Sequence, residues 1–264
     1  MKREEFVASS HLPPTGMAGV SVDVAACAAL AFTSACLAHE VLGHGGACLV
    51  GGGTVTRMTS SLFACSPRLL LADLGGPGAS LLMAAACALL LRGRRPGSPA
   101  RVALVLAAAF NVLWLAGCLL EAAVAARGDF AYAARLAGAA QAPLRTLFGL
   151  VGVGLGVATC RMLGRQPLTR GALWLAYGVA GAAVCTSALF SVATVGPALR
   201  EAALESLGAM AWLCFVRPRA TATPVQPGPH PSTSRRIVVL ALLALCVLFA
   251  LGHGIDRGAG TLPP

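Results

Sequence analysis

The sequence is poor in charged residues. Asp, Glu, Lys and Arg account for 11% of its 264 residues, whereas 57% are hydrophobic. A soluble domain carries roughly 25% charged residues, so this composition excludes an ordinary soluble domain and indicates a protein surrounded by lipid. The apolar runs also lack the period-two alternation of a membrane barrel. We therefore expect an all-α fold, a polytopic transmembrane helical bundle of six or seven spans, because a helix satisfies its own backbone hydrogen bonds in lipid.

Several patterns that carry function in other proteins are missing. The ten cysteines include no C-x-x-C pair, and only Cys48 and Cys65 flank a loop that a disulfide could close. Five histidines are too few for the histidine boxes of a di-iron desaturase, and only His253 could provide a second axial haem ligand. The net charge of +10 does not indicate nucleic acid as a partner, because the arginines lie between apolar runs and report topology. No apolar segment directly follows the N-terminal charges, so we expect no cleavable signal peptide.

Apolar runs long enough to cross a bilayer recur along the chain, since about 20 apolar residues span ~30 Å as a helix. We predict spans at 17–50, 69–91, 102–126, 144–163, 172–199 and 237–252, and a shorter segment, 203–216, that is either a seventh span or an interfacial helix. The predicted organisation is a cytoplasmic tail (1–16), a membrane domain with a candidate metal site (17–216), a proline-rich disordered linker (217–236), and a final transmembrane helix with a short tail (237–264).

The distribution of lysine and arginine predicts the orientation of the chain. With a cytoplasmic N-terminus and seven spans, thirteen of the 20 lysines and arginines fall inside and seven outside. This predicts a multi-pass protein of the inner or plasma membrane. It also places the segment HEVLGH (39–44), Asp73, Glu121 and Asp129 at one depth near the outer side, where random placement would scatter them.

The segment HEVLGH places two histidines and a glutamate inside a span. An ionisable group there costs about 2.5–3.5 kcal/mol on insertion scales, so the cluster needs a partner. A metal ion is such a partner, because imidazoles bind zinc, a carboxylate completes three protein ligands, and water takes the fourth position. A glutamate beside the first histidine can take a proton from that water. We predict His39 and His44 as zinc ligands and Glu40 as the catalytic base.

The spacing of the two histidines requires a distorted helix. In the zinc-protease motif H-E-x-x-H the histidines are four residues apart and share a face. In H-E-x-x-x-H they are five residues apart, and on a regular helix their directions would differ by roughly 140°. A π-type bulge absorbs one residue and restores a common face, and Gly43 lowers its cost. We therefore predict a π-bulge in the segment 39–44.

The third ligand must come from another part of the chain. Asp129, Asp73 and Glu121 all lie at the predicted depth of the histidines. A competing interpretation makes Asp129 a helix-end acid that pairs with Arg127 or Arg135. The residues alone leave these alternatives open.

The histidine segment is similar to H-E-L-L-G-H-G of the dipeptidyl peptidase III family, whose zinc peptidases use the longer spacing with both histidines as ligands and the glutamate as base. The likeness covers residues 39–45. The membrane context resembles the site-2 protease family of intramembrane zinc metallopeptidases. Three segments over roughly residues 30–135 carry this resemblance: HEVLGHGGACLVGGGTVTRM, GGPGASLL and FNVLWLAGCLLEAAVAARGDF. It implies that His39, His44 and Asp129 bind zinc and that Glu40 is the base.

These observations favour a zinc metalloendopeptidase embedded in the membrane, which hydrolyses peptide bonds of a membrane protein or peptide at or near the bilayer. We expect an extended substrate to lie along GGGTVTRM (51–58) by strand addition. The alternative is a non-catalytic polytopic membrane protein, either transporter-like or an assembly or regulatory scaffold, with a structural histidine cluster. A break of the second span at GGPG (75–78) would favour a transporter.

Overall fold

A computed structural model describes residues 16–95, 97–192, 195–219 and 231–256. The predicted N-terminal tail up to residue 15, most of the predicted linker (220–230) and the C-terminal tail from residue 257 lie outside this part of the chain. Within it, nearly every segment is helical, and six helices are long and apolar enough to cross a membrane. The predicted all-α transmembrane bundle is therefore confirmed.

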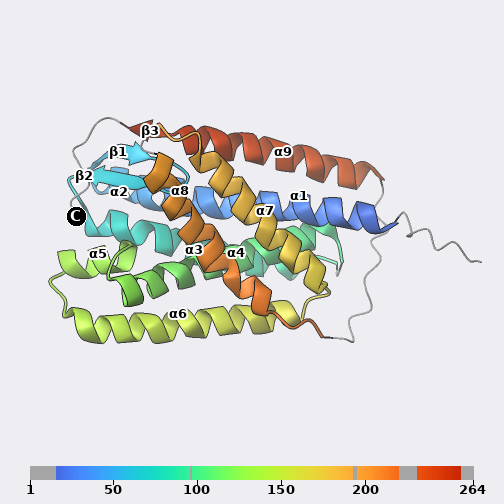
Figure 1. Ribbon diagram of the computed structural model, residues 1–264, viewed down its shortest axis with the longest axis horizontal. Coiled ribbons are helices and arrows are strands. Elements are labelled where there is room, and N and C mark those ends of the chain that lie inside the picture. Colours follow the sequence, from blue (N-terminus) through green and yellow to red (C-terminus); the bar gives the residue numbers. More distant parts are fainter. Residues whose placement is uncertain (1–15, 96, 193–194, 220–230, 257–264) are drawn as a thin grey trace, which may run out of the picture.

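The six spans match the predicted runs closely at their starts (Figure 1). The first, Val22–Val50, is one continuous helical run that joins three elements end to end: α1 (Gly16–Cys36), η1 (Leu37–Gly45) and α2 (Gly46–Val50). The other spans are formed by α3 (Leu70–Leu91), α4 (Pro99–Ala125), α6 (Gln141–Gly164), α7 (Arg170–Ala188) and α9 (Pro231–His253). A short helix, α5 (Asp129–Leu136), connects α4 to α6.

The predicted fifth span, 172–199, is wrong at its C-terminal end. Helix α7 stops at Ala188, and the chain returns beside it through α8 (Val195–Ala203), η2 (Leu204–Gly208) and η3 (Ala211–Phe215) (Figure 1). The return starts where Ser61 donates to the Ala198 carbonyl and ends where the Arg219 N–H donates to the Gly164 carbonyl, at the other end of the bundle. The doubtful segment 203–216 is thus the second half of this helical return, which is not among the six helices long and apolar enough to cross a membrane. Hydropathy does not reveal the turn, because it lies within an uncharged run, 172–199.

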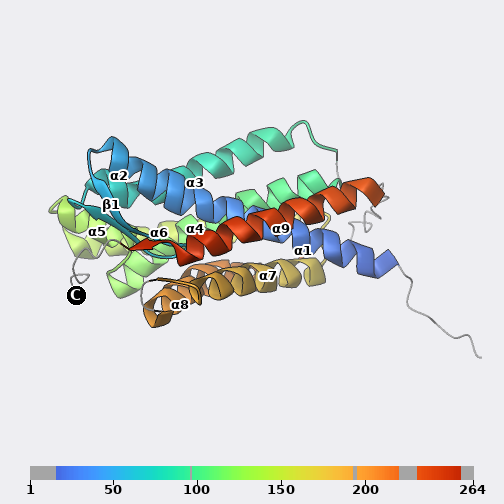
Figure 2. The same cartoon turned by 90° about the horizontal axis from the view of Figure 1, so that it is seen from above.

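The core of the bundle lies between α1 and α4, whose span windows are 72% and 67% buried. Phe32 of α1 stacks on Trp114 of α4 with ring centroids 5.5 Å apart and meets Phe110 edge-on at 5.8 Å. Figure 2 shows α3 on one side of α1, and α7 with α8 on the other. In α3, α6 and α9 most residues of the span window are not buried, which is the pattern of helices that face lipid.

A small sheet lies over the end of the first span. Strand β1 (Thr54–Met58) pairs antiparallel with β2 (Phe63–Ser66) and with β3 (Ile255–Asp256), in the order β2-β1-β3. The anticipated Cys48–Cys65 disulfide is present and ties the sheet to α2. Strand addition along the whole of 51–58 is not possible, because β2 occupies one edge of β1 and β3 already pairs with Arg57 and Met58 on the other.

The two ends of the bundle differ in charge. We call the end that holds α2, the sheet and α5 the site end, and the opposite end, with the loops around residues 92–98 and 165–169, the arginine-rich end (Figure 1). With the return through α8, η2 and η3 added to the six spans, every described arginine lies at the end to which the charge count assigned it. The loop RGRRPGSPAR (92–101) and Arg161, Arg165 and Arg170 lie at the arginine-rich end.

The structure also shows what three other features of the sequence do. Helix α3 is unbroken, with Pro77 inside it, so the interruption expected of a transporter is not observed. Helix α9 starts at Pro231, within the predicted linker, and proline is tolerated in a first helical turn. The G-x-x-x-G of α6 packs closely: a Cβ on Gly152 would lie 2.9 Å from Leu120 Cγ of α4.

Candidate metal centre

The first span contains the predicted helix distortion. Residues Leu37–Gly45 form a π-helix, in which hydrogen bonds run from i to i+5 and residues five apart lie one above the other. His39 and His44 are therefore on one face, and both are buried. The bulge predicted within 39–44 is confirmed, and the π geometry extends over nine residues.

Glycine allows this distorted turn to pack against α3. A Cβ on Gly43 would lie 2.6 Å from the Cα of Gly76, so the two backbones meet at this crossing. A Cβ on Gly76 would in turn lie 2.7 Å from His39 Nε2 and collide with His44 Nε2. Only a residue without a side chain at position 76 leaves free space in front of both imidazoles.

Asp129 completes a group of three donor atoms. His39 Nε2 and His44 Nε2 are 3.1 Å apart, and they lie 3.4 and 3.5 Å from the two carboxylate oxygens of Asp129. Bonds of about 2.0–2.1 Å to a tetrahedral zinc ion would separate neighbouring ligand atoms by roughly 3.3 Å. The cluster of His39, His44 and Asp129 therefore could hold a metal ion.

Helix α3 sets the direction of both imidazoles. His44 Nδ1 donates to the Ala72 carbonyl at 2.7 Å, and His39 Nδ1 lies 3.0 Å from Ser80 Oγ. A carbonyl only accepts, so His44 Nδ1 carries a proton, and Nε2 is the atom that offers a lone pair to a metal ion when the ring is neutral. Ala72, Gly76 and Ser80 are buried and follow one another at i, i+4 and i+8 on one face of α3. A hydrogen-bond partner at the ring nitrogen that does not bind the metal is typical of metal-binding histidines.

Two aromatic rings hold the imidazole planes. Trp114 stacks on His39 with centroids 5.1 Å apart, and Phe63 of β2 stacks on His44 at 5.1 Å. The interplanar angles are 23° and 17°. The sequence motifs did not predict that Ser80, Gly76, Trp114 and Phe63 would contact the histidines. The small residues Ala72, Gly76 and Ser80 recur at four-residue intervals. This spacing could have indicated which face of α3 contacts the histidines.

A tight turn between α4 and α5 delivers Asp129 to the histidines. Ala126 and Gly128 have positive φ angles of 54° and 80°, and Asp129 is the first residue of α5. Arg127 anchors the turn by bonds to Glu121 at 2.7 Å and to Glu201 at 3.2 Å. The hydrogen bond from Arg127 to Glu121 raises the pKa of Arg127, which remains charged.

The other candidate ligands have different partners. Asp73 forms a two-point contact with Arg68 at 3.2 and 3.3 Å, and Glu121 pairs with Arg127. The competing interpretation of Asp129 is not observed either, because Arg127 contacts the two glutamates and Arg135 donates to the Ala126 carbonyl. Asp129 is thus the acid that the fold brings to the histidines.

The Asp129 carboxylate is ionised in this setting. Burial by itself raises the pKa of Asp129, but the charge of His44 and the imidazole N–H groups of both histidines outweigh it and hold this pKa well below its ordinary value. An ionised carboxylate is the form that binds a metal.

Glu40 is buried beside the cluster, with an exposed fraction of 2%. Its Oε2 atom has no hydrogen-bond partner among the described residues. The carboxylate is close enough to His44, His39 and Asp129 to interact electrostatically with each. A buried carboxyl oxygen without a partner costs stability, so the fold holds Glu40 here at a penalty.

Comparison of the chain with protein-family models, with curated proteins and with solved structures finds no match. The class follows from the structure itself. The fold defines a multi-pass helical membrane protein, and its site is a buried His-His-Asp cluster that could hold a metal ion.

Proposed function

We propose that this protein is a zinc metallopeptidase of the inner or plasma membrane, which hydrolyses peptide bonds of membrane proteins or peptides close to the bilayer surface. One observation carries the proposal: three ligand atoms converge next to a buried glutamate whose Oε2 has no partner among the described residues. Two histidines, one carboxylate and an open fourth position are the donor set of catalytic zinc. A zinc ion held there supplies a Lewis acid and lowers the pKa of a water molecule toward about 7.

Glu40 is suited to move the proton. Its carboxylate can accept a proton from the attacking water and return it to the nitrogen of the leaving amine, as a general base and then a general acid. No other described group satisfies its Oε2 atom, so the carboxylate is available for this task. A purely structural glutamate would be expected to have a hydrogen-bond partner, as Glu121 and Glu201 have.

The same three ligands also suit non-haem iron, which uses two histidines and a carboxylate. Two features support zinc. The two Nε2 atoms are 3.1 Å apart and lie 3.4 and 3.5 Å from different oxygens of Asp129, close to the roughly 3.3 Å that separates neighbouring ligand atoms of a tetrahedral zinc ion. In addition, an iron site that activates oxygen has no evident use for a buried base such as Glu40. Elemental analysis of the purified protein distinguishes the two metals.

The site is proposed to face the outside. The Cys48–Cys65 disulfide lies at the site end, and disulfides persist in oxidising compartments. The excess of arginine at the opposite end supports a cytoplasmic location for that end. Asp129, with 21% of its side chain exposed, is the most accessible member of the cluster and marks the side from which a substrate would approach.

The variant Glu40→Gln tests the function. We expect it to keep the metal content of the wild type, because Glu40 is not a ligand, and to lose turnover by roughly 10²–10⁴-fold, the usual contribution of a general base. Activity is followed on fluorescein-labelled casein and on a library of internally quenched peptides, with the protein in proteoliposomes. Asp23→Asn, which makes the same change from carboxylate to amide near the other end of the first span, is the control. Unchanged turnover in Glu40→Gln would remove this residue from the mechanism, and wild-type protein without metal would exclude the metallopeptidase.

A further inference from the structure

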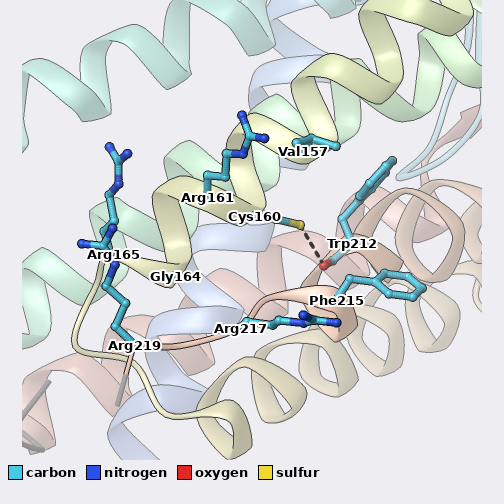
Figure 3. A pocket seen from close by; sticks show the side chains of 9 residues that line it. All are labelled: Val157, Cys160, Arg161, Gly164, Arg165, Trp212, Phe215, Arg217 and Arg219. Atoms are coloured by element: carbon cyan, nitrogen blue, oxygen red, sulfur yellow. Dashed lines mark hydrogen bonds between the residues drawn. The ribbon is translucent and has the colours of Figure 1, made fainter. Parts of the chain in front are cut away.

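The arginine-rich end, opposite the site end, contains an open cavity of about 550 Å³, and Figure 3 shows the residues that line it. It lies between the C-terminal turns of α6 and the segment that follows η3. Four guanidinium groups line it: Arg161 and Arg165 from α6, and Arg217 and Arg219 from the extended segment. Residues 161 and 165 are four apart and share a helix face, and Arg217 and Arg219 belong to the segment that directly follows η3. The lining thus places four positive charges around one cavity, with the guanidinium groups spread along it (Figure 3).

These four arginines lack acidic partners among the residues that the structure describes. At the site end, by contrast, Arg57, Arg68, Arg127 and Arg200 each form an ion pair. No Asp or Glu lines the cavity. The cavity is therefore a concentration of uncompensated positive charge, which attracts an anion from outside the chain.

The rest of the lining is apolar and firmly built. Trp212 packs against α6 at Gly156, where a Cβ would collide with the indole ring. The Cys160 thiol donates to the Trp212 carbonyl at 3.2 Å (Figure 3). Phe215 is 71% exposed beside these residues. The cavity thus combines a cationic side with an aromatic side.

The cavity also lies at the depth of a lipid headgroup. Gly164, at the end of the α6 span, accepts a hydrogen bond from the Arg219 N–H at 3.2 Å, so the cationic segment lies where this span ends. Aromatic rings are enriched at this level of a membrane. Basic pockets between helices on the cytoplasmic side are suited to anionic headgroups.

We propose that this cavity binds one anionic phospholipid, with its headgroup among the arginines and an acyl chain against Trp212 and Phe215. The proposal is independent of the metal centre. A topological role for the arginines requires only that they lie at this end. It does not require that they converge on one cavity with an aromatic wall.

Native mass spectrometry of the purified full-length protein in detergent tests this. The protein is titrated with dioleoyl phosphatidylglycerol and, separately, with dioleoyl phosphatidylcholine. We expect the first lipid to bind at least about tenfold more tightly, and the double variant Arg161→Gln with Arg217→Gln to lose about tenfold or more of that affinity. The matched control, Arg94→Gln with Arg95→Gln, removes the same charge from the same end outside the cavity and should change the affinity less than about twofold. If the first pair fails to fold, Arg165→Gln with Arg219→Gln replaces it.

Two further measurements distinguish a lipid headgroup from free phosphate as the bound anion. Millimolar inorganic phosphate should leave the lipid bound, and Trp212→Ala should weaken lipid binding, because the acyl chain contributes to affinity. Displacement by phosphate with no effect of Trp212→Ala would overturn the lipid assignment in favour of a free-anion site. Equal binding of the two lipids, or an equal loss in the control pair, would overturn the proposal as a whole.

Discussion

His39 and His44 are five residues apart in the sequence, yet their Nε2 atoms are 3.1 Å apart. The π-helix over Leu37–Gly45 makes this possible, because it places residues i and i+5 on one face. The rings are then fixed from α3 and stacked on Trp114 and Phe63. Two imidazoles this close cannot both direct a proton at each other, so their Nε2 atoms either share one proton or turn both lone pairs toward a shared cation.

The first prediction concerns metal content. Wild-type protein is expected to carry about one metal ion per chain, and His39→Ala or His44→Ala to carry less than about a tenth of that, because two protein ligands hold zinc far less well than three. Inductively coupled plasma mass spectrometry of the purified protein gives the ratio and the element. His253→Ala, at the end of α9, is the control and should keep the wild-type ratio. A metal content that is the same in all four proteins would show that the ion is bound elsewhere.

The second prediction separates the acids. Asp129→Asn should release the metal, since an amide is a poor ligand for zinc, whereas Asp73→Asn should retain it. Asp73 contacts Arg68, and the loss of this partly exposed ion pair is expected to cost no more than about 1 kcal/mol of stability. Metal content and thermal stability are measured on both variants. Release of metal by Asp73→Asn alone would move the third ligand to α3.

Sequence reasoning reached the helical bundle because the apolar runs are long and their flanking arginines are many. It reached the π distortion because the two histidines can share an ion only on a distorted helix. It favoured Asp129 through topology and resemblance, but only the fold shows why: the other two candidate acids form ion pairs with Arg68 and Arg127. No local sequence pattern indicates which of these residues will pair.

Other features were beyond sequence reasoning for a different reason. The turn after Ala188 lies within an uncharged run, 172–199, so hydropathy gives no contrast there. Strand β3 is only two residues long and pairs with a strand almost two hundred positions earlier, a contact that periodicity cannot indicate. The roles of Gly76 and Ser80 depend on how closely α3 approaches η1, which is a property of packing.

The third prediction tests the close contact between α3 and η1. Gly76→Ala would place a methyl group in front of both Nε2 atoms, so we expect it to reduce the metal content by at least about tenfold. Gly78→Ala makes the same chemical change two residues later on α3, where a Cβ meets nothing within 4 Å. It should keep the metal, and by helix propensity it should stabilise α3 by about 0.5–1 kcal/mol. If Gly76→Ala binds metal as well as Gly78→Ala does, the space in front of the imidazoles is not where the ion lies.

The fourth prediction concerns orientation. Single cysteines are introduced into a cysteine-free background by Ala137→Cys, on the exposed C-terminus of α5 at the site end, and by Arg94→Cys, at the arginine-rich end. A membrane-impermeant maleimide applied to intact cells should label the first and not the second, because the arginine-rich end is expected in the cytoplasm. After the cells are opened, both should react. Labelling of Arg94→Cys in intact cells would reverse the orientation and place the metal centre on the cytoplasmic side.

The fifth prediction distinguishes a functional glutamate from a structural one by stability. Glu40 is buried, and its Oε2 lacks a partner among the described residues, so Glu40→Leu should raise the unfolding free energy of the metal-free protein by about 1–3 kcal/mol, the cost of an unsatisfied buried polar group. Unfolding of chelator-treated protein in detergent is followed by circular dichroism. Thr33→Val is the matched control, because Thr33 Oγ1 is also buried without a partner in the described structure, but as a neutral hydroxyl it should give a smaller gain. A gain in stability in Glu40→Leu is the result expected of a residue that is retained for chemistry although it lowers stability. A loss of stability in Glu40→Leu would instead mean that the carboxylate holds the bundle together, and the base proposed for catalysis would then be a structural group.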